Sequence, residues 1–268
     1  MRRSPLVVLV SSLLLAVGTA LTGAATAQAS DLAATGPYAA LGDSYSSGVG
    51  AGSYIGSSGD CKRSTKAYPY LWAAANSPSR FDFTACSGAR TGDVLSGQLG
   101  PLSSATTLVS ISVGGNDAGF ADVMTTCVTQ SDSTCLSRVN TARAYVDSTL
   151  PGKLDSVYSA IRSKAPNARV VVLGYPRFYK LGTTCLGLSE TKRKAINDAS
   201  DQLNSTIGKR AANHGFAFGD VRGAFTGHEI CSGSSWLHSV NWLNIGESYH
   251  PKAPGQSGGY LPVFNAND

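Results

Sequence analysis

Short apolar runs that end at glycine or proline alternate with longer amphipathic stretches along most of this chain of 268 residues. The clearest run, residues 169–173, reads Arg-Val-Val-Val-Leu and stops before Gly174. Apolar runs of about four to eight residues between turn residues are typical of strands buried on both faces, as in parallel sheets. Because parallel strands need long crossover connections, usually helices, the alternation favours an α/β fold.

The pattern predicts about five strands and four helical segments. The strands are expected at 38–41, 81–85, 108–113, 169–173 and 216–218, and the helices at 68–76, 136–163, 189–212 and 253–261. Thr65 and Ser189 are the expected caps of the first and third helices, the second is expected to be bent or broken at Pro151-Gly152, and residues 219–246 are expected to form a long ordered loop. This organisation predicts a single-domain α/β/α sandwich in three layers around a parallel sheet.

The first residues resemble an export signal. Arg2 and Arg3 precede a short apolar stretch at 6–17, and Ala27-Gln28-Ala29 offers a cleavage site between small residues. The alternative, a membrane anchor, is disfavoured because a spanning helix needs roughly 20 apolar residues. The paired arginines are only a weak indication of a twin-arginine signal. We therefore expect a signal peptide at 1–29, a mature domain at 30–268, and a secreted, extracellular protein.

The charge and the cysteine content of the chain argue against nucleic-acid and metal binding and in favour of disulfides. The formal charge falls from +5 to +3 once Arg2 and Arg3 are removed, and the remaining basic residues are scattered, so no nucleic-acid partner is expected. An even number of cysteines in an exported chain predicts three disulfides, for which 15 connectivities exist and neighbour pairing is the simplest. No C-x-x-C and no histidine pair with ligand spacing occurs, so no metal site is expected. The cysteines are Cys61, Cys86, Cys127, Cys135, Cys185 and Cys231.

Small and polar residues directly follow three of the predicted strands. Ser44 lies in Gly42-Asp43-Ser44-Tyr45, Gly88 follows the second strand and Asn116 the third. Because the carboxyl ends of parallel strands meet at one edge of the sheet, these residues are expected close together. Taken singly, each is explained equally well by an ordinary turn. A serine also needs a base before it can act as a nucleophile.

Four segments in a fixed order carry a more specific signal: Gly42–Tyr45, Gly88, Gly114–Asp117 and Ser248–Pro251. Together they resemble the SGNH (GDSL-type) hydrolase superfamily, and more closely its secreted actinobacterial lipases and phospholipases A1. The resemblance implies the SGNH/flavodoxin-like fold and a serine esterase without cofactor. The segments that carry the closer resemblance are 40–48, 86–93, 111–120, 172–177 and 236–238.

The resemblance also implies the roles of the site residues. Ser44 is the expected nucleophile and His250 the expected general base, while the oxyanion hole is expected from the N–H groups of Ser44 and Gly88 and the side-chain amide of Asn116. This agrees with the chemistry, because glycine permits close approach of the backbone and an asparagine amide donates without carrying charge. The implied disulfides are Cys61–Cys86, Cys127–Cys135 and Cys185–Cys231.

The chain departs from the family pattern at one position. The family usually has an aspartate three residues before the histidine, where this chain has Glu247. Either Glu247 is the third member of a triad, or the backbone carbonyl of Ser248 orients the imidazole in a Ser–His dyad. We favour the dyad, because the extra methylene of a glutamate changes how its carboxylate approaches the ring.

The resemblance implies hydrolysis of fatty-acyl carboxylic esters through an acyl-enzyme, with triacylglycerols, aryl esters or the sn-1 ester of phospholipids as substrates. A monomer in transient contact with lipid interfaces is expected. The alternatives are a carbohydrate acetylesterase, an inactive binding protein on the same fold and, less favoured, a thioesterase or protease. Aromatic residues on predicted loops give an acyl pocket only modest support: Tyr45, Phe120, Phe178, Tyr179, Trp236 and Trp242.

The sequence argues against a dinucleotide-binding enzyme and against a typical α/β-hydrolase. Gly48–Gly52 lacks the third glycine of a dinucleotide fingerprint, since position 53 is serine, and no nucleotide is expected. The G-x-S-x-G elbow of α/β-hydrolases is absent around Ser44. Of the other histidines, His214 is expected at a helix end and His228 in a structural role, whereas His238 is a candidate for the pocket wall.

Overall fold

Five parallel strands form one sheet in the order β2-β1-β3-β4-β5. The computed structural model describes Met1 and residues 36–268, so the expected export signal at 1–29 lies outside the described residues. The order places β1 and β3, both buried throughout, next to each other at the centre. The strands are β1 (Tyr38–Gly42), β2 (Phe81–Phe83), β3 (Leu108–Ser112), β4 (Arg169–Leu173) and β5 (Ala217–Gly219).

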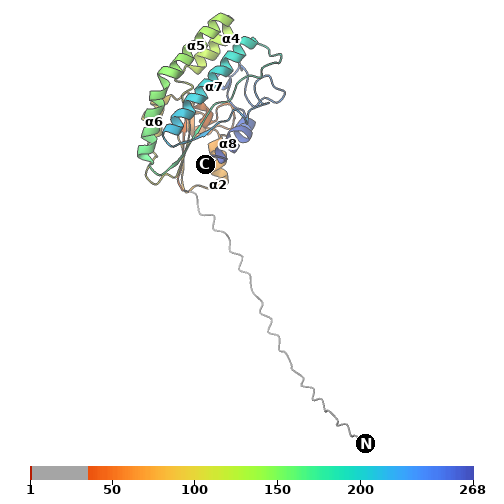
Figure 1. Cartoon of the computed structure of the whole chain (residues 1–268). Helices are drawn as coiled ribbons and strands as arrows, with labels where there is room; N and C mark the ends of the chain where they lie inside the picture. The colour runs from red at the N-terminus through yellow and green to blue at the C-terminus, as the bar shows by residue number, and fades with distance from the viewer. Residues whose placement is uncertain (2–35) are drawn as a thin grey trace. The chain divides into compact units, whose positions relative to one another are not determined.

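Helices cover the sheet, and α5, α6 and α7 lie side by side on one side of it, with α2 and α8 on the other (Figure 1). Tyr38 of β1 packs against Trp72 of α2 and Phe264 of α8. The predicted three-layer α/β class is confirmed. The helices are α1 (Ser44–Ser47), α2 (Tyr68–Asn76), α3 (Thr91–Asp93), α4 (Phe120–Thr129), α5 (Asp132–Ser148), α6 (Leu150–Lys164), α7 (Glu190–Asn213) and α8 (Leu261–Asn265).

Some helix boundaries differ from the prediction. The helix expected at 136–163 is two helices, α5 and α6, which meet at Thr149. The region was expected to be bent or broken at Pro151-Gly152, and it is broken at Thr149, so that Pro151 lies in the first turn of α6, where its missing N–H has no helical partner to lose. Thr65 does not cap α2, which begins after Ala67 without a side-chain cap, whereas Ser189 caps α7 as predicted. The segment expected to be helical at 253–261 continues through α8 to Asn265.

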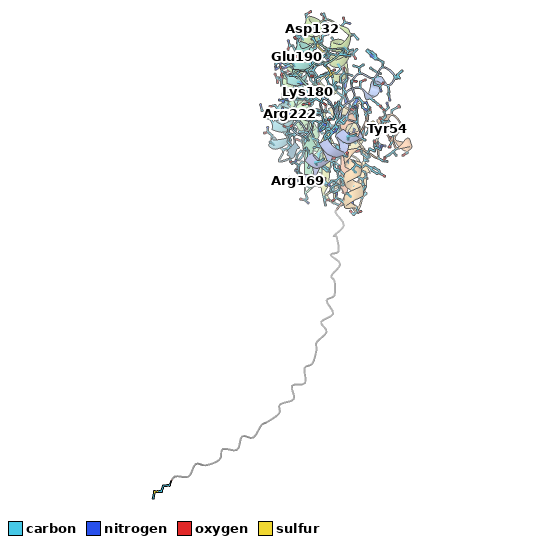
Figure 2. All side chains as sticks on the ribbon, turned by 90° about the vertical axis from the view of Figure 1, so that its right-hand side faces the viewer. Tyr54, Asp132, Arg169, Lys180, Glu190 and Arg222 are labelled. Carbon is cyan, nitrogen blue, oxygen red and sulfur yellow. A yellow bond between two sulfur atoms is a disulfide. The ribbon has the colours of Figure 1, made fainter. Side chains whose placement is uncertain are left out.

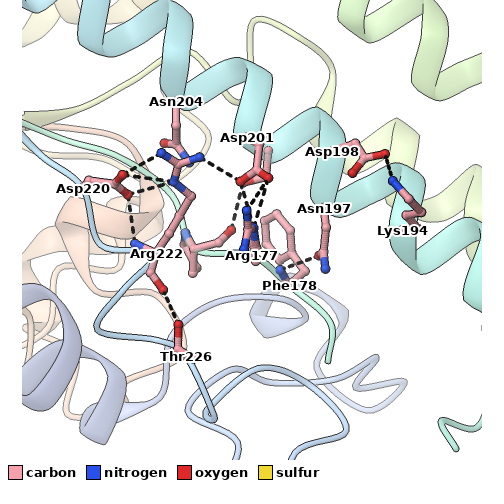
Figure 3. A network of polar contacts seen from close by, with 12 residues as sticks. Arg177, Phe178, Lys194, Asn197, Asp198, Asp201, Asn204, Asp220, Arg222 and Thr226 are labelled. Carbon is pink, nitrogen blue, oxygen red and sulfur yellow. Dashed lines mark hydrogen bonds and ion pairs between the residues drawn. The ribbon is translucent and has the colours of Figure 1, made fainter. Parts of the chain in front are cut away.

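Polar side chains of α7 hold the loops that follow β4 and β5 (Figure 3). The buried amide of Asn204 accepts a hydrogen bond from Tyr175 N (2.8 Å) and donates one to Tyr175 O (2.7 Å). Asn197 accepts from the N–H of Phe178 (3.0 Å), and Asp201 forms ion pairs with two arginines from these loops. Because these groups are buried or ion-paired, the loop after β4 is fixed against the helix layer.

The disulfides link neighbouring loops and helices. Cys61–Cys86 joins the segment after α1 to the turn after β2, Cys127–Cys135 joins α4 to α5, and Cys185–Cys231 joins the loops before α7 and after β5. These are the pairs that the family resemblance implies. The first of them fixes the turn that carries Gly88.

Candidate active site

Ser44 stands at the carboxyl end of β1, where the chain turns sharply into α1. Gly42, the last residue of the strand, has φ +118°, and a Cβ there would lie 2.3 Å from the carbonyl oxygen of Ser112. Only glycine fits this turn. Asp43 then caps α1 by accepting from Tyr45 N (3.0 Å), which leaves Ser44 as the first helical residue, with 5% of its surface exposed.

His250, near the C-terminus of the chain, lies next to Ser44. Its Nε2 lies 2.7 Å from the Oγ of Ser44, although 206 residues separate them. The preceding residue, Tyr249, has φ +69°, an uncommon conformation for a bulky side chain. It is held there by hydrogen bonds from its N–H to the carbonyl of His238 and from the Tyr45 hydroxyl to its own carbonyl. The strained residue therefore aims the imidazole at the serine.

Gly88 and Asn116 line the same cleft as Ser44. Gly88 has φ +78° in the turn after β2, and the Nδ2 of Asn116 donates to the carbonyl of Ala89 (3.0 Å). That bond uses one of the two N–H groups of the amide. Ser44, Gly88, Asn116 and His250 all line one cleft of about 460 Å³. The four predicted site residues are thus brought together between the ends of β1, β2 and β3.

A model of the GDSL-like lipase/acylhydrolase family matches residues 40–257. The chain belongs to this family. Lipase 1 of Streptomyces coelicolor is 80% identical over 265 residues, which are 99% of both chains. The crystal structure of phospholipase A1 from Streptomyces albidoflavus is 70% identical with a TM-score of 0.87, and that of an extracellular lipase from Streptomyces rimosus 66% with 0.86. Each alignment covers 88% of this chain and 100% of the other.

The aspartate of this GDSL chain's Gly-Asp-Ser segment anchors a buried hydrogen-bond network that sequence reasoning missed. Asp43 accepts from the hydroxyl groups of Tyr175 (2.5 Å) and Ser112 (2.7 Å). Burial raises the pKa of Asp43 to about 6, although these hydrogen bonds oppose the rise. The Tyr175 hydroxyl also accepts from Gly115 N (3.3 Å). Tyr175 therefore connects the residue before the serine with the residue before Asn116.

The carboxylate of Glu247 is hydrogen-bonded to another residue and not to the imidazole. Its Oε1 accepts from the Tyr54 hydroxyl (2.7 Å), and among residues 36–268 no side chain hydrogen-bonds to Nδ1 of His250. The main chain of Ser248 approaches the ring without completing a well-aligned hydrogen bond, and it raises the pKa of the imidazole. Within the described residues, the imidazole therefore has a main-chain neighbour and no carboxylate hydrogen-bonded to it.

The substitution Glu247→Gln is expected to change kcat less than threefold, because glutamine can still accept from Tyr54 and no bond to His250 is lost. Steady-state hydrolysis of a p-nitrophenyl ester measures the effect. A loss of about 10³–10⁴, the scale of removing a triad acid, would show that Glu247 orients the histidine in solution.

Burial lowers the pKa of His250 to about 4, against a smaller opposite effect of the Ser248 main chain. A histidine with a lowered pKa keeps its neutral form at pH 7, and only the neutral ring can accept the proton of Ser44. The imidazole is therefore a ready acceptor across the neutral and mildly acidic range.

We expect kcat/KM to fall with decreasing pH through an inflection near pH 4, because protonation of His250 removes the base. The pH profile of kcat/KM reports groups of the free enzyme. The carboxyl group of Asp43, whose pKa is about 6, could also contribute to the profile. Measuring the same profile for Asp43→Asn removes that contribution. An inflection that stays at the ordinary histidine value of about 6.5 in both proteins would contradict the lowered pKa of His250.

A second, smaller cavity of about 70 Å³ extends from Ser44 into the layer of α4, α5 and α7. Its walls are mostly apolar, and Ser44 and Asn116 lie at the end that it shares with the cleft. Such a space suits the end of a hydrocarbon chain rather than a sugar. The apolar side chains of the three helices that line it are Phe120, Val123, Met124, Val139, Ala142, Val146, Ile196, Ala199 and Leu203.

The aromatic residues considered for a pocket divide into two groups. Tyr45, Phe120 and Phe178 line the apolar cavity, and Trp242 joins Phe120 in lining the cleft. Tyr179 instead contacts the hydroxyl of Tyr249 (3.2 Å). Trp236 stacks on another ring, outside the linings of both cavities.

The remaining histidines have structural contacts. His214 follows α7 and pairs with Asp155 (3.0 Å), and His228 stacks on Trp236 with ring centroids 3.6 Å apart. His238 lies within 2.8 Å of the carbonyl of Gly50 and lines neither the cleft nor the apolar cavity.

Proposed function

We propose that this protein is a secreted serine ester hydrolase that cleaves fatty-acyl esters, with lipids as its substrates. The observation that carries the proposal is the Ser44–His250 pair, 2.7 Å apart, at the junction of an open cleft and an apolar cavity. Ester hydrolysis needs the pair, and a long acyl chain needs the apolar space. The names of the close relatives, lipase and phospholipase A1, support the same class.

In the proposed mechanism Ser44 attacks the ester carbonyl while His250 takes its proton. The developing oxyanion accepts hydrogen bonds from the N–H groups of Ser44 and Gly88 and from the amide of Asn116. His250 next protonates the leaving alcohol, and then activates water to hydrolyse the acyl-enzyme. His250 acts without a carboxylate partner, in a dyad with the Ser248 carbonyl beside it.

Export is part of the proposal. No helix within the described residues is long and apolar enough to cross a membrane. The segment at 1–29 is proposed to be removed after Ala29, which leaves residues 30–268 as a monomeric domain. The N-terminal sequence and the mass of the protein recovered from culture medium test the cleavage position.

The test of function is hydrolysis of p-nitrophenyl esters from C2 to C16 and of phosphatidylcholine. Activity that rises toward long chains supports a lipolytic enzyme, and release of the sn-1 fatty acid from phosphatidylcholine identifies a phospholipase A1. Activity confined to C2 would instead indicate an acetylesterase. No activity with any ester, in a folded and disulfide-bonded sample, would favour a binding protein.

Ala142→Leu tests whether the apolar cavity takes the acyl chain. The added methylenes fill space that the chain would occupy, and each methylene excluded from apolar surroundings loses about 0.8 kcal/mol. We expect the C12-to-C4 ratio of kcat/KM to fall about tenfold. Ala144→Leu, on the exposed side of the same helix, is the matched control and leaves the ratio unchanged. An unchanged ratio in both variants would place the acyl chain elsewhere.

A further inference from the structure

Large apolar side chains are exposed together in the segment 241–246, which we call the rim loop. Leu243 is fully exposed, Trp242 is 72% exposed and Ile245 is 62% exposed. Single exposed apolar residues are common on soluble proteins, but a contiguous group marks a surface that meets another apolar phase. The rim loop is therefore a candidate contact surface.

The rim loop is continuous with the cleft that contains the Ser44–His250 pair. Trp242 and Ile245 line that cleft as well as projecting into solvent, and α4 forms the facing wall. Leu243 lies between them in the sequence and lines no part of the cleft. A surface that met the rim loop would therefore lie at the mouth of the cleft.

A cation lies beside the apolar side chains. The Nζ of Lys62 is next to Gly246, and among residues 36–268 it forms no ion pair. The carboxylate of Glu247 is hydrogen-bonded to Tyr54 instead. Apolar side chains with an unpaired lysine at their edge match a lipid surface, in which phosphates lie above the acyl region.

We propose that the rim loop inserts into the outer part of a phospholipid surface and holds the mouth of the cleft against it. Leu243 enters the acyl region, Trp242 lies at the interface, where tryptophan is enriched, and Lys62 meets a headgroup phosphate. The proposal rests on the proposed function. A second copy of the chain fits less well, since three side chains offer at most about 500 Å² per copy and a stable interface buries about 800 Å² per partner.

Co-sedimentation with vesicles tests the insertion directly. Both proteins carry Ser44→Ala so that the vesicles stay intact, and binding to phosphatidylcholine vesicles is compared with and without Leu243→Asp. We expect binding to weaken at least tenfold, because the leucine side chain that enters the lipid is lost and a charge is placed at the acyl boundary. Leu243→Trp is expected to retain binding.

The matched control is Leu186→Asp, in another exposed loop. Leu186 is 94% exposed and lines neither the cleft nor the apolar cavity. The N–H of Gly182 in the same loop donates to Glu190, which Figure 2 shows apart from Tyr54, the hydrogen-bond partner of Glu247. This variant is expected to bind like the parent protein. Equal weakening in both variants, or no binding by the parent, would overturn the assignment to the rim loop. A dimer in solution that Leu243→Asp dissociates would replace the lipid surface by a second copy.

Lys62→Gln tests the headgroup contact. Adding phosphatidylglycerol to the vesicles is expected to increase the affinity of the parent protein for them. In Lys62→Gln this increase in affinity should be about fivefold smaller. With Ser44 intact, Leu243→Asp should hydrolyse a soluble, monomeric short-chain ester within twofold of the parent rate. An equal loss on soluble ester and on vesicles would contradict an interfacial role. Failure of the parent to hydrolyse any ester would reject the proposed function. The co-sedimentation experiment does not depend on hydrolysis, so it would still decide whether the rim loop binds lipid.

Discussion

Ser44→Ala and His250→Ala are each expected to lower kcat by about 10⁶, and the double variant is expected to lose no more than either single variant. A nucleophile without its base is inert, and a base without its nucleophile has no proton to take, so the two losses do not add. Hydrolysis of p-nitrophenyl decanoate measures kcat for the two single variants and the double variant. The residual rate reports binding and the oxyanion donors alone.

His228→Gln is the control for the histidine substitution. Its ring stacks on Trp236 and its Nδ1 lies near the carbonyl of Ser234, so it does not meet the cleft. It should keep kcat within about twofold. The proposal of a Ser–His pair would have to be abandoned if His250→Ala kept more than a few per cent of the parent kcat with an unchanged melting temperature.

Asn116→Ala is expected to lower kcat by about 10²–10³ with little change in KM. The amide is proposed to donate to the oxyanion, a charge that is present in the transition state and absent from the bound ester, and removal of one such donor typically has this effect. Measuring kcat and KM separately distinguishes this loss from weaker binding. A fall of less than threefold would remove Asn116 from the oxyanion hole.

A matched variant separates the lost donor from a loosened loop, because Asn116 also bonds the carbonyl of Ala89. Asp117 accepts from Thr91 N (3.0 Å) and Thr91 Oγ1 (2.6 Å), and so ties the same two loops without lining the cleft. Asp117→Asn weakens that tie and leaves Asn116 in place. If Asp117→Asn lowered kcat as much as Asn116→Ala, the effect would come from loop position and not from the donor.

The sheet was predictable because its strands are short apolar runs that stop at turn residues. Helix α4 was missed because five of its ten residues are β-branched, which lowers helix propensity. A signal was nevertheless present: Phe120, Val123, Met124 and Cys127 follow the i, i+3, i+4, i+7 spacing of one helix face. The interruption between α5 and α6 was expected at Pro151-Gly152 and lies at Thr149, because a proline fits the first turn of a helix and the break precedes it.

The site residues were named from ordered motifs, and their proximity follows from strands that end at one edge of the sheet. Their roles stay predictions. The supporting contacts were beyond sequence reasoning, because their partners are distant in the chain: Tyr175 bonds a residue 132 positions earlier, and Tyr45 bonds Tyr249 across 204. The positive φ of Tyr249 also had no local signal, since tyrosine rarely adopts it.

Within residues 36–268 no disulfide encloses both Ser44 and His250; the bridges span 25, 8 and 46 residues. The C-terminal segment is fastened to the start of the domain by the fully buried Gln256, which accepts from Tyr68 N (3.0 Å) and donates to Tyr45 O (3.0 Å). A chain still emerging from the ribosome therefore holds a serine without a base. With the export proposed above, this means that the membranes of the producing cell meet no active hydrolase until translation is complete and both ends have folded together.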